Sequence, residues 1–308
     1  MRYRRIDLNL LAALNLLLNE RNVSRTAAAL NVSQSTMSGI LSRLREVFDD
    51  ELLVPVGRQL QLTPLGASLL APTQDAMLRI DSLLATKPQF DAATAARHFV
   101  IAASDYALSD FLADALQVIS HEAPGLSFDV VQIGTPGTAG LESGEVDFAV
   151  MPANMVNTEH PYRVLFEDGY TVIAWDSNRQ LGETLDLATY KRLGHVLLRP
   201  GKVGQPWFEQ WYLNEHGDSR RVEVRVHSFN LMPQMVVGTD RIATVQSRLA
   251  RRCAQTLPLR LYPLPMAAPK LTEVLQWNRL HDQDPGNRWL RERMLELAQH
   301  LTHHLAQT

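Results

Sequence analysis

One short segment carries side chains that could read DNA. On one face of residues 33–43 stand short or hydrogen-bonding side chains: Ser33, Gln34, Ser35, Thr36, Ser38, Gly39, Ser42 and Arg43. A glutamine amide can pair with an adenine edge, and serine or threonine hydroxyls with several bases. Arg43 and the nearby Arg45 could reach guanine or a phosphate. The alternative is the solvated face of an ordinary surface helix.

The elements around this segment have the order of a helix-turn-helix. Residues 6–19 show helical apolar spacing, and we expect Ser24 to cap a second helix that ends at Leu30. Asn31 tolerates the left-handed conformation at a helix end. Ser33 then starts a third helix through about residue 47, with Met37 facing inward. The small Ala27, the turn-forming Asn31 and the apolar Met37 are what this motif requires.

A wing and a long helix are expected next. Residues 52–56 and 59–62 flank Gly57-Arg58, which predicts strand, turn and strand. Arg58 at the tip would lie over the DNA backbone or minor groove. Thr63-Pro64 predicts a helix start, and that helix should run to about residue 86 with a kink at Pro72. Its apolar seam favours pairing with a second copy: Leu65, Leu69, Ala76, Ile80 and Leu83.

The pattern from residue 97 onward predicts an α/β domain. Short apolar strands alternate with helices, which favours mostly parallel sheets. We expect strands at 98–103, 127–133, 146–151, 170–175, 195–198, 222–226 and 242–245, with helices at 108–121 and 140–143. Segments 170–175 and 271–277 are the expected crossings between two subdomains with a cleft between them.

Composition and charge are consistent with this division. The chain has 308 residues, 45% hydrophobic and 20% charged, which indicates a globular protein of about two domains. Cys253 is the only cysteine, so no internal disulfide is possible. The net charge is −3, but residues 1–62 carry +2 and the remainder −5. A mildly basic head on an acidic body fits a DNA reader joined to another domain.

The first residues resemble a secretory signal. Three arginines precede the mostly apolar stretch 8–18. Polar residues interrupt that stretch, and no small-residue cleavage site follows it. No apolar run approaches the ~20 residues that cross a bilayer. We therefore expect a cytoplasmic protein.

Signals of catalysis or metal binding are weak. Residues 134–140 are glycine-rich but lack the Gly-Lys-Ser/Thr ending of a phosphate loop, and no hydrolase or zinc-protease motif is present. His300, His303 and His304 share metal-ligand spacing without a nearby cysteine or acid, so a solvated helix is favoured. The basic run Arg248, Arg251 and Arg252 is interpreted as a helix face. We expect no enzyme activity, metal or cofactor.

Short motifs in both halves of the chain match those of a known family. In the head they are 7–11 (DLNLL), 27–30 (AAAL), 33–38 (SQSTMS) and 62–66 (LTPLG), and in the body 141–147 (LESGEVD). These resemble LysR-type transcriptional regulators along the whole chain. Further motifs are similar to a subgroup of nodulation regulators and salicylate- or nitroaromatic-responsive activators: 48–52 (FDDEL), 56–58 (VGR), 104–107 (SDYA) and 284–287 (DPGN). Ser35 stands where many members have proline, which leaves the operator sequence uncertain.

The resemblance implies an architecture. Residues 1–62 would be a winged helix-turn-helix, 63–90 a linker and dimerisation helix, and 91–308 a periplasmic-binding-protein-like effector domain. Its subdomain I would span about 97–167 and 272–308, and subdomain II about 168–271. The family implies a homodimer or homotetramer that binds an upstream operator, changes DNA bending with an aromatic effector, and works with RNA polymerase.

The family also implies site residues. Ser104, Thr135 and His227 match effector-contacting positions, and Tyr106, Phe229 and Trp277 are added with them. Strand-end hydroxyls and a histidine could bind an aromatic acid or phenol, although such residues often only cap helices or fill cores. The expected DNA contacts are Ser33, Gln34, Ser35, Thr36, Ser38, Arg43, Arg58 and Thr63.

The leading hypothesis is a DNA-binding regulator, an activator in this subgroup, switched by a small aromatic effector. A small-molecule receptor or enzyme with an N-terminal dimerisation module is the alternative, and a regulator that senses no ligand is a third possibility. The effector, the target genes and the sign of regulation stay open.

Overall fold

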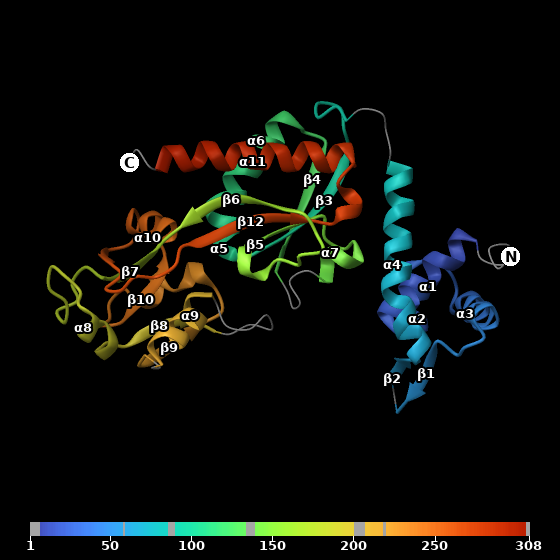
Figure 1. Ribbon diagram of the computed structural model, residues 1–308, viewed down its shortest axis with the longest axis horizontal. Helices are drawn as coiled ribbons and strands as arrows, with labels where there is room; N and C mark the ends of the chain where they lie inside the picture. Colours follow the sequence, from blue (N-terminus) through green and yellow to red (C-terminus); the bar gives the residue numbers. More distant parts are fainter. Residues whose placement is uncertain are drawn as a thin grey trace. The chain divides into compact units, whose positions relative to one another are not determined.

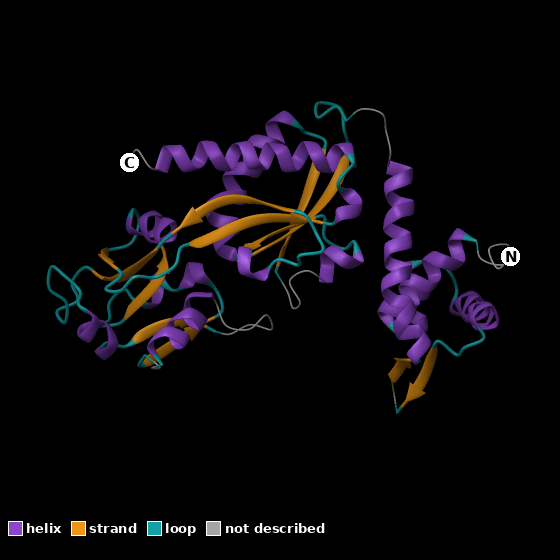
Figure 2. Ribbon diagram, in the orientation of Figure 1, coloured by secondary structure: helices purple, strands orange, loops and turns teal. Residues whose placement is uncertain are grey.

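The chain forms two compact units, shown by a computed structural model (Figures 1 and 2). The structure describes residues 7–57, 59–85, 90–133, 139–199, 207–217 and 220–305. The first unit holds the N-terminal helices and one hairpin, and the second holds two five-stranded sheets. In the part so described, no helix is long and apolar enough to span a membrane.

The first unit is a helix-turn-helix followed by a wing. Its elements are α1 (Leu8–Glu20), α2 (Val23–Ala29), α3 (Gln34–Phe48), β1 (Leu53–Val56), β2 (Gln59–Leu62) and α4 (Pro64–Ala85). Ala27 and Met37 are buried, and Asn31 has φ 53° between α2 and α3, as predicted. The predicted cap of α2 is wrong, because the Asn22 side chain, not Ser24, accepts from the Arg25 backbone N–H.

Helix α4 is continuous through Pro72 and packs against α1. The predicted seam is only partly free for another chain, because Leu69 packs against the buried cluster of the first unit. Leu65 and Leu83 are exposed, Leu83 to 72%. One face of α4 therefore packs on the core of the first unit, and Leu65 and Leu83 lie on its surface.

Each sheet of the second unit forms the centre of one subdomain. The first sheet has the order β4 (Leu126–Gln132), β3 (Arg97–Ala103), β5 (Phe148–Pro152), β12 (Leu271–Trp277) and β6 (Tyr162–Asp168). The second has the order β11 (Leu259–Pro263), β7 (Tyr170–Trp175), β10 (Ile242–Gln246), β8 (His195–Leu198) and β9 (Val222–Val226). We call them subdomain I and subdomain II.

Both sheets are mixed, so the prediction of mostly parallel sheets is wrong. In subdomain I, β3 pairs in parallel with β4 and β5, but β12 is antiparallel to β5 and β6. In subdomain II, β8 pairs in parallel with β9 and β10, but β7 is antiparallel to β10 and β11. The chain crosses between the subdomains at Gly169 and again at residues 264–270, so the strands 170–175 and 271–277 flank the crossings.

Helices follow several of the strands and cover the two sheets, and helices are found in the predicted regions 108–121 and 140–143. After β3 come α5 (Asp105–Ala107), a π-helical turn η2 (Leu108–Leu112) and α6 (Ala113–Glu122). Helix α11 (Pro285–Leu305) contacts β6 and α6 (Figure 1). The remaining helices are α7 (Ala139–Ser143), α8 (Leu187–Arg192), α9 (Trp207–His216) and α10 (Ser247–Ala254), with 3-10 turns η3 (Ala153–Met155), η4 (Phe229–Leu231), η5 (Pro233–Met235) and η6 (Arg279–His281).

Candidate nucleic-acid interface and effector site

The outward face of α3 presents most of the predicted DNA-reading residues together. Gln34, Ser35, Ser38 and Arg43 are exposed. Ser33 is the N-cap: its hydroxyl accepts from the Thr36 backbone N–H at 3.1 Å. The cap satisfies a backbone N–H that would otherwise lack a partner, and it therefore stabilises the first turn of α3.

Some of the predicted reading residues also bond within the helix. The Ser33 hydroxyl lies 2.8 Å from the hydroxyls of Ser35 and of Thr36. Ser38 donates to the Gln34 backbone carbonyl at 3.0 Å. The Gln34 amide and the Arg43 guanidinium extend from this short-side-chain surface, so they are the groups with the longest reach toward a base or a phosphate.

Thr63 is a structural residue of the wing base. It is buried, and its hydroxyl accepts from the Gly66 backbone N–H at 3.0 Å. The same hydroxyl donates to Asp50 Oδ1 at 2.6 Å, which also accepts from the Leu52 N–H at 2.6 Å. This network caps α4 and anchors Leu52, whose φ is 59°. Thr63 was predicted to contact DNA, and in the structure its hydroxyl makes one donated and one accepted hydrogen bond inside the chain.

The wing is tied to α3 through Arg45. Its Nε donates to the Glu51 carbonyl at 2.9 Å, and its Nη2 donates to the Leu53 carbonyl at 3.1 Å. Arg45 therefore positions the wing, whereas the sequence had suggested a DNA contact. Gly57 has φ 62° at the wing turn, a conformation that glycine adopts without strain. Arg58 lies outside the described residues.

The predicted effector residues lie at the carboxyl ends of strands from both subdomains. Ser104 follows β3 and caps α5, accepting from the Ala107 N–H at 3.1 Å. His227 follows β9 and is exposed. Phe229 begins η4, and its ring centroid lies 6.4 Å from that of the buried Tyr106. Ligands of open α/β sheets bind at such strand ends.

Trp277, another predicted effector residue, is not part of this group. Trp277 pairs with Phe148 in the sheet, well before the carboxyl end of β5. Its indole donates to Asp282 at 3.1 Å, and the Arg291 guanidinium lies 4.6 Å from its ring centroid. Trp277 thus belongs to the packing beneath α11. Thr135 lies outside the residues that the structure describes.

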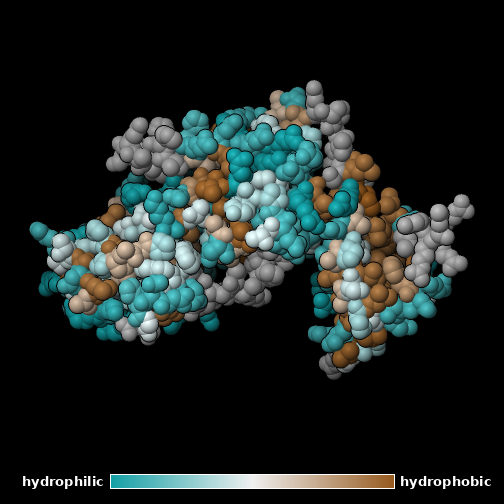
Figure 3. Space-filling view, viewed as in Figure 1, coloured by the Kyte–Doolittle hydropathy of each residue, from teal (hydrophilic) through white to brown (hydrophobic). Residues whose placement is uncertain are grey.

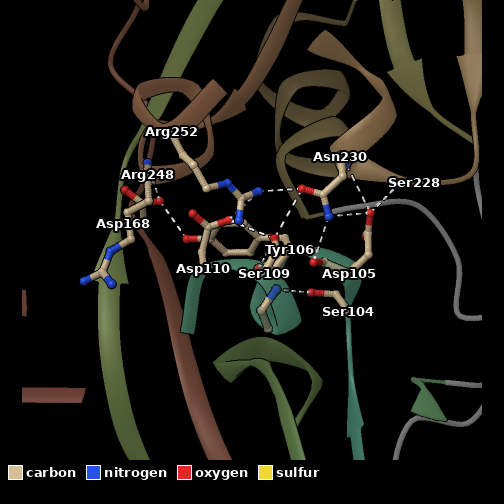
Figure 4. A network of polar contacts seen from close by, with 11 residues as sticks. Ser104, Asp105, Tyr106, Ser109, Asp110, Asp168, Ser228, Asn230, Arg248 and Arg252 are labelled. Carbon is tan, nitrogen blue, oxygen red and sulfur yellow. Dashed lines mark hydrogen bonds and ion pairs between the residues drawn. The ribbon is translucent and has the colours of Figure 1, made fainter. Parts of the chain in front are cut away.

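A polar network that was not predicted joins the two subdomains beside Ser104 (Figure 4). Asp105 accepts from Ser228 at 2.6 Å and from the Asn230 backbone N–H at 3.1 Å. Arg252 donates to Asn230 at 2.6 Å and lies 3.3 Å from Asp110. The sequence signal was available: Asp105 stands in the motif at 104–107, and Arg252 in the basic run.

The basic run is not the helix face that was expected. Arg248 is buried, with its guanidinium 4.2 Å from the Phe166 ring centroid, and its backbone N–H donates to Asp168 at 3.1 Å. Arg252 is engaged in the inter-subdomain network. Only Arg251 has the exposure of a solvated face. Spacing alone could not separate these three roles, because the carboxylates and rings that receive the side chains come from other strands.

Burial raises the pKa of three acidic side chains in subdomain I. Tyr106 donates to Asp168 at 2.7 Å, and burial followed by this carboxylate raises the pKa of Tyr106. Burial, and then the nearby Asp168, raises the pKa of Glu273 to about 8. Burial likewise raises the pKa of Asp110 to about 6, although Arg252 opposes the shift. Among the residues that are described, no group of three or more His, Cys, Asp or Glu could hold a metal ion.

Two family models match the chain. Residues 8–67 match the bacterial regulatory helix-turn-helix protein, lysR family, and residues 92–299 match the LysR substrate binding domain. Nodulation protein D 2 of Rhizobium tropici is 39% identical over 298 residues, covering 97% of this chain and 95% of that protein.

Solved structures agree with these matches. A probable transcriptional regulator from Pseudomonas aeruginosa has a TM-score of 0.64 and 28% identity, over 95% of this chain and 97% of that one. CbnR in complex with its target DNA has a TM-score of 0.53 and 14% identity, over 95% of this chain and all of that one, which shows the shared fold. Since these likenesses extend over both units, the chain belongs to the LysR family, and it is a DNA-binding transcriptional regulator with a substrate-binding domain rather than an enzyme.

Proposed function

We propose that this LysR-type regulator is switched by a small aromatic effector that binds where β3 and β9 end. The carrying observation is that the two residues after Ser104 contact the segment 228–229 across the two subdomains: Asp105 accepts from the Ser228 hydroxyl, and the Tyr106 ring lies against that of Phe229. The Phe166 ring centroid lies 6.4 Å from that of Tyr106, which in turn contacts Phe229. A flat ligand needs apolar walls and a few fixed polar groups, and this junction offers both.

The polar groups suit an acid or a phenol. His227 is exposed and can donate to a carboxylate or phenolate. The Ser104 hydroxyl, which caps α5 as an acceptor, keeps its own proton to donate. We retain Thr135 in the proposal because it follows β4, the strand that pairs with β3. The described contacts of Tyr106 and Trp277 favour structural roles for these two.

A direct test uses ligand binding and induction together. Thermal shift against benzoates, phenols and flavonoids should identify a compound that raises the melting temperature. The variant His227→Ala should then weaken induction by that compound while operator affinity stays the same. His121→Ala, at an exposed histidine of α6, is the matched control. Absence of any shift across the panel would favour a regulator that senses no aromatic ligand.

We further propose that α3 enters the major groove of the operator. Gln34, Ser35, Thr36 and Ser38 would face bases, with Arg43 and the wing residue Arg58 on the backbone. Replacing Gln34 by Ala should weaken binding by ~1–3 kcal/mol, the range for one good base contact. Fluorescence anisotropy on DNA upstream of its own gene measures this, with Gln117→Ala of α6 as control. Equal affinity of both variants would count against the proposal.

The assembly would form through α4. Figure 3 shows apolar side chains gathered over α4 on the visible face of the first unit, and Leu65 and Leu83 are exposed. We propose that residues 1–62 read DNA, 63–90 join two copies, and 91–308 bind the effector. Two such dimers would make a tetramer that acts in the cytoplasm as an activator, in contact with RNA polymerase.

A further inference from the structure

Asn230 uses its whole amide side chain to join the two subdomains. Its Nδ2 donates to the Asp105 carbonyl at 3.0 Å and lies 3.3 Å from Asp105 Oδ2. Its Oδ1 accepts from the Ser109 hydroxyl at 3.2 Å and from Arg252 at 2.6 Å. Asn230 lies in η4 of subdomain II, whereas Asp105 and Ser109 follow β3 of subdomain I. In Figure 4 the Asp105 and Asn230 side chains point toward each other.

Asp105 is the acceptor on the other side. One carboxylate oxygen, Oδ2, accepts from the Ser228 hydroxyl at 2.6 Å and from the Asn230 backbone N–H at 3.1 Å. Hydrogen bonds to an ionised group are shorter and stronger than neutral ones. Both donors lie directly beside His227 and Phe229, so the Asp105 carboxylate holds this wall of the proposed site by its backbone as well as by a side chain.

An ion pair supports the same contact. The Arg252 guanidinium, which donates to Asn230, also lies 3.3 Å from Asp110, a carboxylate with only 5% of its side chain exposed. Arg252 comes from α10, so three segments of the chain meet here. We call Asp105, Ser109, Asp110, Ser228, Asn230 and Arg252 the latch.

The crossing strands provide an independent tie. Asp168, at the end of β6, accepts from the Tyr106 hydroxyl of subdomain I and from the Arg248 N–H of subdomain II. Tyr106 belongs to this tie, and its ring lies 6.4 Å from that of Phe229, which is next to Asn230 of the latch. Two separate attachments fix the angle between subdomain I and subdomain II, whereas a single attachment would allow the subdomains to rotate about it.

We propose that Asn230 and Asp105 are positioning residues that set the width of the effector site before any ligand arrives. This inference rests on the proposed function for its link to an effector, but the latch itself does not. A site already held in its binding arrangement spares the ligand the cost of ordering it, and a receptor that is competent only part of the time binds more weakly by that fraction. Loss of the latch should therefore weaken effector binding without altering the fully bound state.

A charge exchange tests the latch in the full-length, ligand-free protein. Asn230→Asp places a second carboxylate against Asp105, which should open the junction. The double variant Asp105→Asn/Asn230→Asp restores one amide facing one carboxylate. Hydrogen–deuterium exchange of peptides covering residues 104–112 and 226–235 should be about 10- to 100-fold faster in the single variant, since charge-assisted bonds hold these amides closed. In the double variant it should return to within about threefold of wild type, as restored pairing predicts.

Two controls separate positioning from general destabilisation. Peptides of the central strand β5 should exchange at the wild-type rate in every variant. Asn214→Asp makes the same substitution in α9, where the side chain bonds only to Gln210 among its described contacts, and should leave all exchange rates unchanged. Unchanged exchange at the latch in Asn230→Asp, or failure of the double variant to restore it, would overturn the proposal.

The effector readout uses the first compound of the benzoate, phenol and flavonoid panel that raises the wild-type melting temperature. Asn230→Asp should raise the dissociation constant of that compound, measured at one temperature by isothermal titration calorimetry, about tenfold, as expected when the competent fraction falls. The double variant should restore the wild-type dissociation constant. An unchanged or lower dissociation constant in Asn230→Asp would overturn the positioning role. If no compound shifts the wild type, the aromatic effector is refuted and the exchange data alone decide on the latch.

Discussion

Replacing Thr63 by valine should destabilise the first unit while leaving the second unchanged. Valine has nearly the shape of threonine but no hydroxyl, so the change removes two hydrogen bonds and little volume. One is the cap on the Gly66 N–H, and the other is the bond to Asp50. Asp50 keeps only its bond from the Leu52 N–H, and Leu52 loses part of what holds its left-handed backbone.

The expected cost follows from these two bonds. Loss of an N-cap costs ~1 kcal/mol, and loss of a hydrogen bond to a charged, half-buried group costs ~1.5–3 kcal/mol. Because the two bonds share one hydroxyl, they are not independent, and we expect about 3 kcal/mol in total. For a unit of this size, that corresponds to a fall of roughly 12–24 °C in its melting temperature.

The tryptophans make the assay selective. All five lie between residues 175 and 289, in the second unit, so their fluorescence reports that unit alone, whereas circular dichroism at 222 nm reports all helices. In Thr63→Val the dichroism should show an early transition and the fluorescence midpoint should not move. Thr63→Ser, which keeps both bonds, is the control. A dichroism transition identical to wild type, or an equal shift in both signals, would refute the reasoning.

Three further predictions concern other residues. Because the folded chain binds the Glu273 proton more tightly than the unfolded chain does, the free energy of unfolding should fall as pH rises from about 5 to 8. Glu273→Gln should make that fall smaller and leave the part below about pH 6 that Asp110 contributes, and a fall as large as in the wild type would contradict this. Arg45→Ala should weaken operator binding about tenfold through the wing, the size of one lost positioning contact. The slope of log affinity against log salt should stay unchanged, and a slope smaller by about one would instead indicate a phosphate contact. Leu83→Asp should raise the dimer dissociation constant about 100-fold, from two buried leucines at ~1.5 kcal/mol each, measured by light scattering; an unchanged assembly would exclude α4 pairing at this residue.

Local chemistry made the first unit largely predictable. The Ser33 and Thr63 caps, the left-handed Asn31 and the buried Met37 depend on neighbours within a few residues, and all four are found. The cap of α2 was misassigned by two positions, since Asn22 and Ser24 both have capping side chains. Which residue caps depends on where the preceding helix ends, and Arg21 ends α1 with φ 48°.

Long-range partners explain what the sequence did not show. The strands β6 and β11 were missed because half of β6 is exposed and β11 is interrupted by charge. Whether a strand is parallel or antiparallel to its neighbour depends on the subdomain from which the chain enters it. The spacing of apolar residues along the sequence does not contain this information. The same holds for the candidate site: Ser104 and Phe229 were predicted as effector contacts from their positions in the chain, but Asn230 and Arg252 gain their contacts only from Asp105 and Asp110, more than a hundred residues away in the chain.

Because the chain crosses twice between the two sheets, the two units can be completed only at different times during synthesis on the ribosome. The wing is complete once Leu62 has emerged, but β12, which ends at Trp277, occupies an interior place between β5 and β6. The first sheet of the substrate-binding domain is therefore complete only when nearly the entire chain has been synthesised, and until then β5 lacks one of its neighbours. Such late, distant pairing is slow and leaves an open strand edge vulnerable to aggregation. A product terminated before β12 would carry the complete DNA-binding unit without a complete substrate-binding domain.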